Sequence, residues 1–131
     1  SSLTNLVMDA NDIESNGTSG TGHGVNFATV VNSNITNAVV SNNTIDGNDD
    51  DGFRLVNPDT AGSAIDLTFQ DNTITNQTNG IGLNLQFNNA EVANINIESV
   101  TNGNNISNNG SLGAFINSDG TSDVNLTVGG A

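Results

Sequence analysis

Apolar and polar residues alternate in short runs along the whole chain, and this alternation predicts β-strands. In residues 65–69 (Ile-Asp-Leu-Thr-Phe) and 124–128 (Val-Asn-Leu-Thr-Val) every second residue is apolar, as in a strand that buries one face. Asn, Gly, Asp, Ser and Thr separate the runs, and these residues favour tight turns and left-handed backbone angles. No stretch of useful length has the i, i+3, i+4 apolar spacing of an amphipathic helix. The pattern therefore predicts an all-β protein with no substantial helix.

A three-residue motif, Asn-x-Ile, returns four times at nearly constant spacing. The copies are Asn11-Asp12-Ile13, Asn43-Thr44-Ile45, Asn72-Thr73-Ile74 and Asn104-Asn105-Ile106. The four isoleucines are 32, 29 and 32 residues apart, and an amide residue follows each of them after three positions. Those amide residues are Asn16, Asn48, Gln77 and Asn109. Self-similarity at a fixed period is the sequence signature of a repeat protein.

Each repeat also has two further apolar stretches. One begins with glycine, and its copies are Gly24-Val25-Asn26-Phe27, Gly52-Phe53-Arg54-Leu55, Gly80-Ile81-Gly82-Leu83 and Gly113-Ala114-Phe115-Ile116. The other stretch directly precedes each Asn-x-Ile motif. Three short strands per repeat of roughly 30 residues predict a parallel β-helix, a solenoid of about four coils. We predict one domain over residues 1–131, with coils at 3–34, 35–63, 64–92 and 93–123 and a final strand at 124–128.

Equivalent residues of successive coils are expected to stack, about 4.8 Å apart. Stacking would place the four isoleucines of the motif, Ile13, Ile45, Ile74 and Ile106, in one interior column. The asparagines of the motif, Asn11, Asn43, Asn72 and Asn104, would form a ladder in which each side-chain amide hydrogen-bonds the next. We predict that these two columns hold the coils together.

The repeats resemble the right-handed parallel β-helix repeats of the pectate-lyase-like superfamily, of the kind found in bacterial or archaeal surface and adhesin proteins. The resemblance runs from about Leu3 to Val128 and implies a right-handed solenoid. It implies no single function, because that superfamily includes lyases, hydrolases, phage tailspikes and adhesins. A β-sandwich is the main competing fold, since it also has many short strands separated by turns. A sandwich, however, does not require Asn at the same place in every repeat.

The charge balance excludes several classes of partner. The chain has 14 acidic residues and one basic residue, Arg54, and its formal net charge is −13. Without a basic patch we expect no binding to nucleic acid or to an anionic membrane surface. No apolar run approaches the roughly 20 residues that span a bilayer, so membrane insertion is not expected. There is no Cys, which excludes a disulfide framework and a thiolate zinc site.

The densest acidic segment contains Asp46, Asn48, Asp49, Asp50 and Asp51. One interpretation is a calcium loop, because calcium binds six to eight oxygen ligands and acidic residues at alternating positions supply them. The other is a solvated acidic turn between two strands. A smaller acidic pair, Asp12 and Glu14, is expected on the outer face of a strand whose Ile13 points inward. We expect no cofactor to be required.

The sequence gives little support for catalysis, and we assign no catalytic residue. Polygalacturonases, which share the β-helix fold, have a Gly-His-Gly element near paired aspartates and an Arg-x-Lys element. Here His23 lies between two glycines but precedes the aspartates, and there is no Lys. Arg54 is expected to point outward and to pair with Asp49, Asp50 or Asp51. Sugar-binding platforms usually include Trp or Tyr, and the chain has neither.

The sequence therefore favours a non-enzymatic, extracellular or cell-surface structural module. No capping segment is apparent at either end, and the chain opens at Ser1 without an initiator Met or a signal peptide, as expected of a piece of a longer precursor. Copies could stack head to tail into a filament, or the coils could be part of a long surface adhesin. The alternative is a carbohydrate-binding or polysaccharide-cleaving β-helix that uses acidic groove residues and binds surface glycans. Seven Asn-x-Ser/Thr sequons are candidate glycosylation sites: Asn16, Asn34, Asn42, Asn76, Asn105, Asn109 and Asn125.

Overall fold

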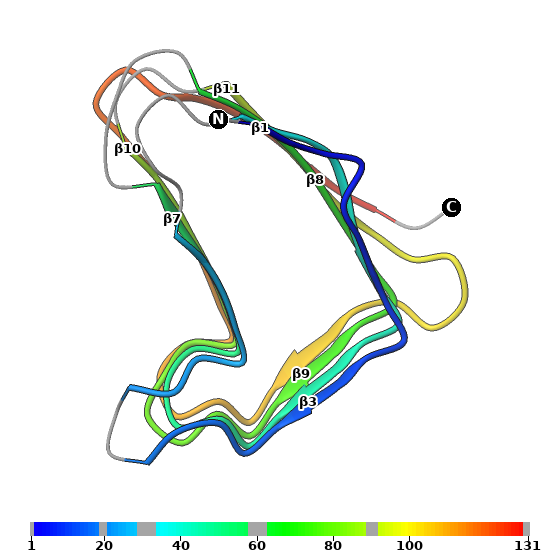
Figure 1. Ribbon diagram of the computed structural model, residues 1–131, viewed down its shortest axis with the longest axis vertical. Helices are drawn as coiled ribbons and strands as arrows, with labels where there is room; N and C mark the ends of the chain where they lie inside the picture. Colours follow the sequence, from blue (N-terminus) through cyan, green and yellow to red (C-terminus); the bar gives the residue numbers. More distant parts are fainter. Residues whose placement is uncertain (1, 19–20, 29–33, 58–62, 89–91, 130–131) are drawn as a thin grey trace.

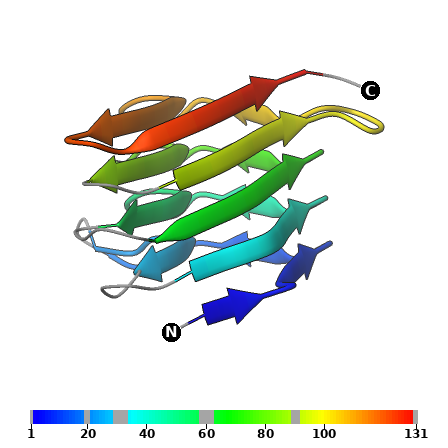
Figure 2. The same cartoon turned by 90° about the horizontal axis from the view of Figure 1, so that it is seen from above.

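The computed structural model describes residues 2–18, 21–28, 34–57, 63–88 and 92–129. Throughout these ranges the chain is all β and contains no helix. It winds into a parallel β-solenoid of about four turns with three strands per turn, which confirms the predicted fold class. Figure 1 views the stack from its N-terminal end. From β1 (Ser2–Thr4) past β3 (Asp12–Glu14) to β7 (Phe53–Asn57) the chain runs clockwise and away from the viewer, so the solenoid is right-handed (Figures 1 and 2).

Three parallel sheets form the sides of the solenoid, and every pairing joins strands of neighbouring coils. Sheet A contains β1 (Ser2–Thr4), β2 (Val7–Asp9), β5 (Asn34–Ser41), β8 (Ala64–Gln70), β11 (Val92–Glu98) and β14 (Asp123–Val128). Sheet B contains β3 (Asp12–Glu14), β6 (Thr44–Asp46), β9 (Thr73–Thr75) and β12 (Asn105–Ser107). Sheet C contains β4 (Val25–Ala28), β7 (Phe53–Asn57), β10 (Leu83–Asn88) and β13 (Ala114–Asp119). Figure 2 shows these strands as stacked layers, with the N-terminal coil at the bottom and the C-terminal coil at the top.

Two corners in each coil turn the chain into and out of sheet B. The residue at the first corner has a left-handed backbone in every coil: Ala10, Asn42, Asp71 and Gly103, with φ between 53° and 76°. The residue at the second corner does as well: Ser15, Gly47, Asn76 and Asn108, with φ between 54° and 61°. Gly, Asn and Asp adopt this conformation most readily, and they occupy six of these eight corners. Each corner residue is followed directly by one of the motif amides.

The interior is filled by columns of apolar side chains. The isoleucines of the repeated motif pair in register, Ile13 with Ile45, Ile45 with Ile74 and Ile74 with Ile106. The three largest core residues are Phe53, Phe69 and Phe87, each at most 1% exposed. The ring centroids of Phe53 and Phe69 are 4.8 Å apart in an edge-to-face arrangement. Sheets A and C are therefore joined across the interior by aromatic contact.

The register of sheet C corrects one detail of the sequence alignment. Leu83 pairs with Phe53, and the Phe53 amide donates to the carbonyl of Gly82. The glycine equivalent to Gly52 is therefore Gly82, two residues beyond Gly80, which the alignment had chosen. A shift of two residues preserves the alternation of apolar and polar positions, so the pattern alone could not detect it.

The two end coils bury their apolar side chains less completely than the middle coils. At the N-terminal end Leu3, which pairs with the buried Ile35, is 39% exposed, and at the C-terminal end Val128 is 70% exposed. The interior positions of the middle coils, by contrast, are at most 4% exposed. The strands at both ends pair on one side only, so each end of the described stack presents unpaired edges.

Candidate functional site

The residues of the predicted calcium loop take up different positions in the structure. Asp46 accepts hydrogen bonds from Thr75 and Asn76 of the next coil, both at 2.7 Å. Asn48 is fully buried, and its Oδ1 accepts from the backbone N–H and the side-chain amide of Asn16. The side chains of Asp46 and Asn48 therefore join coils to one another. Asp49 accepts from the Asn79 side chain at 3.1 Å.

Asp50 and Asp51 instead lie beside His23, which comes from the first coil. The His23 Nδ1 atom is 3.6 Å from Asp50 Oδ2 and 3.9 Å from Asp51 Oδ2. Backbone hydrogen bonds hold the two segments together: the Asp50 amide donates to Gly22 at 3.0 Å, and the Gly24 amide donates to Asp51 at 2.9 Å. The three side chains offer one nitrogen and two oxygen ligand atoms within 4.8 Å of one another. Sequence order had suggested no such proximity.

Asp51 is the most constrained member of this cluster. It is 5% exposed, and its Oδ1 accepts from the backbone N–H of Ile81 at 2.8 Å. Its Oδ2 accepts from the side chain of Asn84, also buried, at 2.7 Å. The Nε atom of Arg54 is 3.7 Å from the same oxygen, so Arg54 pairs with the acidic segment. These partners hold the carboxylate at a fixed position toward the outer face of sheet C.

The outer face of sheet C continues the cluster as a polar column. Register places Asn26, Arg54, Asn84 and Phe115 side by side on strands β4, β7, β10 and β13. Arg54 donates to Asn26 at 3.1 Å, and Gln86 donates to Asn84 at 2.9 Å. Phe115 is half-buried and, unlike the other four phenylalanines, is not part of the core cluster. The column therefore contains hydrogen-bonding groups and one aromatic ring on an accessible sheet face.

Two ladders of side-chain amides run through the coils. In the first, Nδ2 of each Asn donates to Oδ1 of the Asn in the next coil, at 2.9, 2.9 and 3.0 Å from Asn11 through Asn43 and Asn72 to Asn104. The same Oδ1 atoms also accept backbone N–H groups. The second ladder contains Asn16, Asn48, Gln77 and Asn109, whose amide oxygens accept the backbone N–H of the preceding member. Both ladders run in one direction, so their two ends differ chemically.

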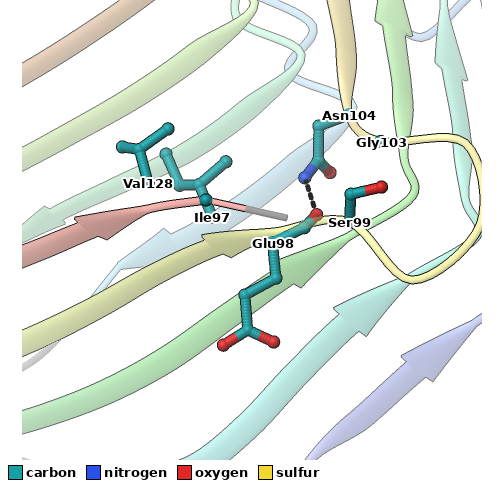
Figure 3. Close-up of a pocket in the computed structure, with 7 residues that line it drawn as sticks. Ile97, Glu98, Ser99, Gly103, Asn104 and Val128 are labelled. Carbon is teal, nitrogen blue, oxygen red and sulfur yellow. Dashed lines mark hydrogen bonds between the residues drawn. The ribbon is translucent and has the colours of Figure 1, made fainter. Parts of the chain in front are cut away.

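The ends of the first ladder have unused hydrogen-bonding groups. In the described part of the chain, no donor reaches Oδ1 of Asn11, and no acceptor reaches the backbone N–H of Asn104. The Asn104 side chain turns back to the carbonyl of Glu98 at 2.8 Å. Beside it lies a pocket of about 270 Å³ lined by Ile97, Glu98, Ser99, Gly103, Asn104, Val128 and Gly129 (Figure 3). The pocket therefore lies at the donor end of this ladder.

A loop beside this pocket is held by one carboxylate. Asp71 accepts hydrogen bonds from the backbone N–H groups of Val100, Thr101, Asn102 and Gly103, at 2.7 to 3.3 Å. Desolvation, the largest single effect, raises the pKa of Asp71, but the four backbone hydrogen bonds together outweigh it and lower the pKa. The ionised carboxylate therefore stabilises the 99–103 loop, which protrudes from the solenoid in Figure 1.

Two acidic groups of the first coil are shifted in opposite directions. Hydrogen bonds from Asn42 and then Ser41 lower the pKa of Asp9. The charge of Asp12 is the main cause that raises the pKa of Glu14. Asp12 and Glu14 are both exposed on β3 while Ile13 packs against the core, as their alternation predicts. This pair is a surface feature of the first coil.

The sequon asparagines differ in how far their side chains are already engaged. Five donate their amide group within the fold: Asn16, Asn42, Asn76, Asn109 and Asn125. Asn34 and Asn105 act as acceptors, from the Ala64 amide and the Ser107 hydroxyl respectively. Glycosylation replaces one of the two Nδ2 hydrogens, so it leaves the described hydrogen bonds untouched at Asn34 and Asn105 and competes with them at the other five.

Among the described residues, no helix has the length and apolar character needed to cross a membrane. Comparisons of the chain with protein-family models, with curated proteins and with solved structures found no match.

Proposed function

We propose that this chain is a non-enzymatic, extracellular structural module, a stretch of β-solenoid whose end faces are covered by further coils of the same kind. The single observation that carries the proposal is the complementarity of the two ends. Asn11 presents an unused acceptor at one end, and Asn104 presents an unused backbone donor at the other. A further coil at either end would continue the ladder and cover exposed inward-facing residues such as Leu3 and Val128.

The outermost strands at the two ends of the described stack lie at different positions around a coil, and this limits what can cover the ends. If β3 of a second copy stacked on β12, both amide ladders would continue from one copy into the next. However, β14 already lies on β11 in sheet A, where β2 of that copy would have to lie. Copies stacked head to tail would have to release one of these strands. Further coils whose first strand after β14 is added to sheet B meet no such conflict. This favours a long solenoid of the surface-adhesin type over a filament of copies.

The location and the family belong to the same proposal. The absence of Lys and the net charge of −13 suit a secreted module. The left-handed corners and amide ladders are consistent with the resemblance to the adhesins of the pectate-lyase-like superfamily. The proposal needs neither a cofactor nor a catalytic residue.

Open end faces should make the isolated chain associate, and substitutions at one face should prevent it. Leu126 faces the interior on β14 and is 46% exposed, so Leu126→Lys places a charge on the end face. Asn94→Lys adds the same charge to the outer face of β11, one coil below. In sedimentation velocity at about 150 mM salt, where surface repulsion is screened, we expect the native chain and Asn94→Lys to associate. Leu126→Lys should remain monomeric.

A native chain that stays monomeric at high concentration, with protected amides in β3 and β14, would contradict the proposal. Electron microscopy of associated material identifies the occupant of the end faces. Regular fibres would indicate that copies of this chain cover the ends, as in the filament, and short irregular assemblies would favour coils of a longer solenoid.

A second candidate, carbohydrate binding or cleavage, rests on a different observation. Asp50 and Asp51 converge with His23 and Arg54 beside the polar column of sheet C, which ends in Phe115. Paired carboxylates can act on glycosidic bonds, and an aromatic ring can stack on a sugar. Turnover of acidic and neutral polysaccharides, measured with and without calcium, tests it. Cleavage that is lost in Asp50→Asn would make the chain an enzyme, and glycan binding without cleavage would make it a binding module.

A further inference from the structure

We propose that His23, Asp50 and Asp51 bind a divalent transition-metal ion that fastens the first coil to the second. His23 lies in the loop between β3 and β4, and the two aspartates lie in the loop between β6 and β7. A metal ion bound by all three would cross-link these loops. The inference is independent of what covers the ends of the solenoid.

The spacing of the ligand atoms suits a small cation. Metal–nitrogen and metal–oxygen bonds of about 2.0–2.2 Å in tetrahedral geometry place the ligand atoms roughly 3.4 Å apart. The His23 Nδ1 atom is 3.6 and 3.9 Å from the two carboxylate oxygens, and all three atoms lie within 4.8 Å of one another. Because no pair is more than 4.8 Å apart, side-chain movements of about 1 Å or less would bring all three atoms to this spacing.

The hydrogen bonding of His23 points to a missing ligand. Its Nδ1 atom is buried from solvent, and in the described part of the chain it has no hydrogen-bond partner. The carboxylate oxygens of Asp50 and Asp51 that face it are 3.6 and 3.9 Å away, too distant for a hydrogen bond. A buried nitrogen without a partner is unfavourable, and a metal ion between it and the carboxylates would satisfy all three groups.

The ligand set selects the class of metal. Imidazole nitrogen with two carboxylates suits zinc, cobalt or nickel, whereas calcium requires six to eight oxygen ligands. With a neutral imidazole and the Arg54 guanidinium, the cluster has a formal charge of −1, because two carboxylates outweigh one cation. A dication is therefore electrostatically acceptable beside Arg54. Three protein ligands leave the remaining coordination positions to water.

The surroundings hold one ligand in place before a metal arrives. Asn84 donates to Asp51 Oδ2 at 2.7 Å, and the Ile81 amide fixes the other oxygen at 2.8 Å. Such outer partners orient metal ligands, and their removal typically lowers affinity by about 10–100-fold. Asn84 thus acts through Asp51 as a positioning residue.

The test is a titration of the metal-free chain with zinc, and with cobalt as a spectroscopic probe. We expect one equivalent to bind, with cobalt absorption typical of low coordination number and a raised urea midpoint. His23→Ala and Asp50→Asn should each weaken binding at least about tenfold, as should Asn84→Ala. The matched control is Asp49→Asn, which removes the same charge from the same loop outside the ligand set and should bind as the native chain does.

Circular dichroism of the metal-free variants separates lost ligands from lost folding. A folded His23→Ala or Asp50→Asn variant that binds zinc like the native chain would overturn the proposal. Absence of zinc binding by the native chain would overturn it as well. Equal loss of affinity in Asp49→Asn would show that only the general acidity of the loop attracts the ion, which also contradicts a built site.

Discussion

The side chain of Asn72 donates a hydrogen bond from Nδ2 to Oδ1 of Asn104 in the following coil, at 3.0 Å. The same Nδ2 also donates to the carbonyl of Val40 at 2.7 Å. Its Oδ1 accepts both the backbone N–H and the side chain of Asn43, at 3.1 and 2.9 Å. One fully buried amide thus joins its own coil to the coils before and after it, and it does so without contact with water.

Replacing this amide by an apolar group of similar size should destabilise the fold strongly. Asn72→Leu removes the hydrogen bond to the Val40 carbonyl and leaves the Asn43 backbone N–H without its acceptor, and each unsatisfied buried group costs about 1–3 kcal/mol. We expect the free energy of unfolding to fall by about 2–5 kcal/mol, measured by urea denaturation. Asn94→Leu, on the exposed outer face of β11, should change it by no more than about 0.5 kcal/mol. Equal effects of the two variants would show that the ladder does not hold the coils.

A column of glycines should tolerate alanine at its end but not in its middle. A Cβ atom on Gly82 would come within 2.6 Å of the Gly113 carbonyl oxygen and 2.7 Å of Ile106 Cγ2. Gly113 is the equivalent residue of the last coil, and a Cβ there meets nothing closer than 3.4 Å. Gly82→Ala must force the coils apart, so we expect a loss of at least about 1–3 kcal/mol, as for overpacking. Gly113→Ala should be nearly neutral, and the comparison by urea denaturation cancels the intrinsic difference between glycine and alanine.

The hydrogen bonds to Asp71 should make the 99–103 loop sensitive to acid. Because the pKa of Asp71 is lower in the folded chain than in the unfolded chain, its ionised form favours the fold. That stabilisation is complete above the unfolded pKa and is lost as the pH falls through the folded pKa. We expect the amide resonances of Thr101 and Gly103 to shift together below about pH 4, with a midpoint below the usual range of Asp.

Asp71→Asn should abolish this transition at Thr101 and Gly103 and increase amide exchange in the loop at neutral pH. Asp66→Asn removes the same charge from β8 without touching the loop, and it should leave the transition in place. If the loop amides of Asp71→Asn still titrate at the native midpoint, another group controls the loop.

The sequence contained most of the fold because a solenoid repeats its local chemistry. Asn before each motif Ile, and the left-handed residue before each Asn, recur wherever the same corner recurs, so four copies reinforce one another. The register of sheet C was less accessible. Gly80 and Gly82 both precede an apolar residue, and only the hydrogen bond between Gly82 and Phe53 distinguishes them.

The His23 cluster could not be predicted from the repeat because the first coil is longer at this point. The segment from Ser15 to Gly24 is four residues longer than the equivalent segment from Gly47 to Gly52, so the sequence alone does not show which residues correspond. Backbone contacts with the second coil, such as that between Gly22 and Asp50, place His23 opposite Asp51. The sequence did contain one useful signal, since the single His and the densest acidic run both lie in loops that follow sheet B.

Asp51 should contribute more to stability than its neighbour Asp50, although both are ligands in the proposed metal site. Asp51 accepts from the Ile81 backbone N–H and from the buried Asn84 side chain, whereas Asp50 is half-exposed. Without metal, Asp51→Ala leaves both donors unpaired, and hydrogen bonds to a charged group contribute about 1.5–3 kcal/mol each. We therefore expect Asp51→Ala to lower the free energy of unfolding by about 2–5 kcal/mol and Asp50→Ala by less than about 1 kcal/mol, both measured by urea denaturation in the presence of a chelator. Similar losses in the two variants would mean that the acidic loop acts through its total charge. In that case, the buried hydrogen bonds of Asp51 would not be what fixes the second coil to the third.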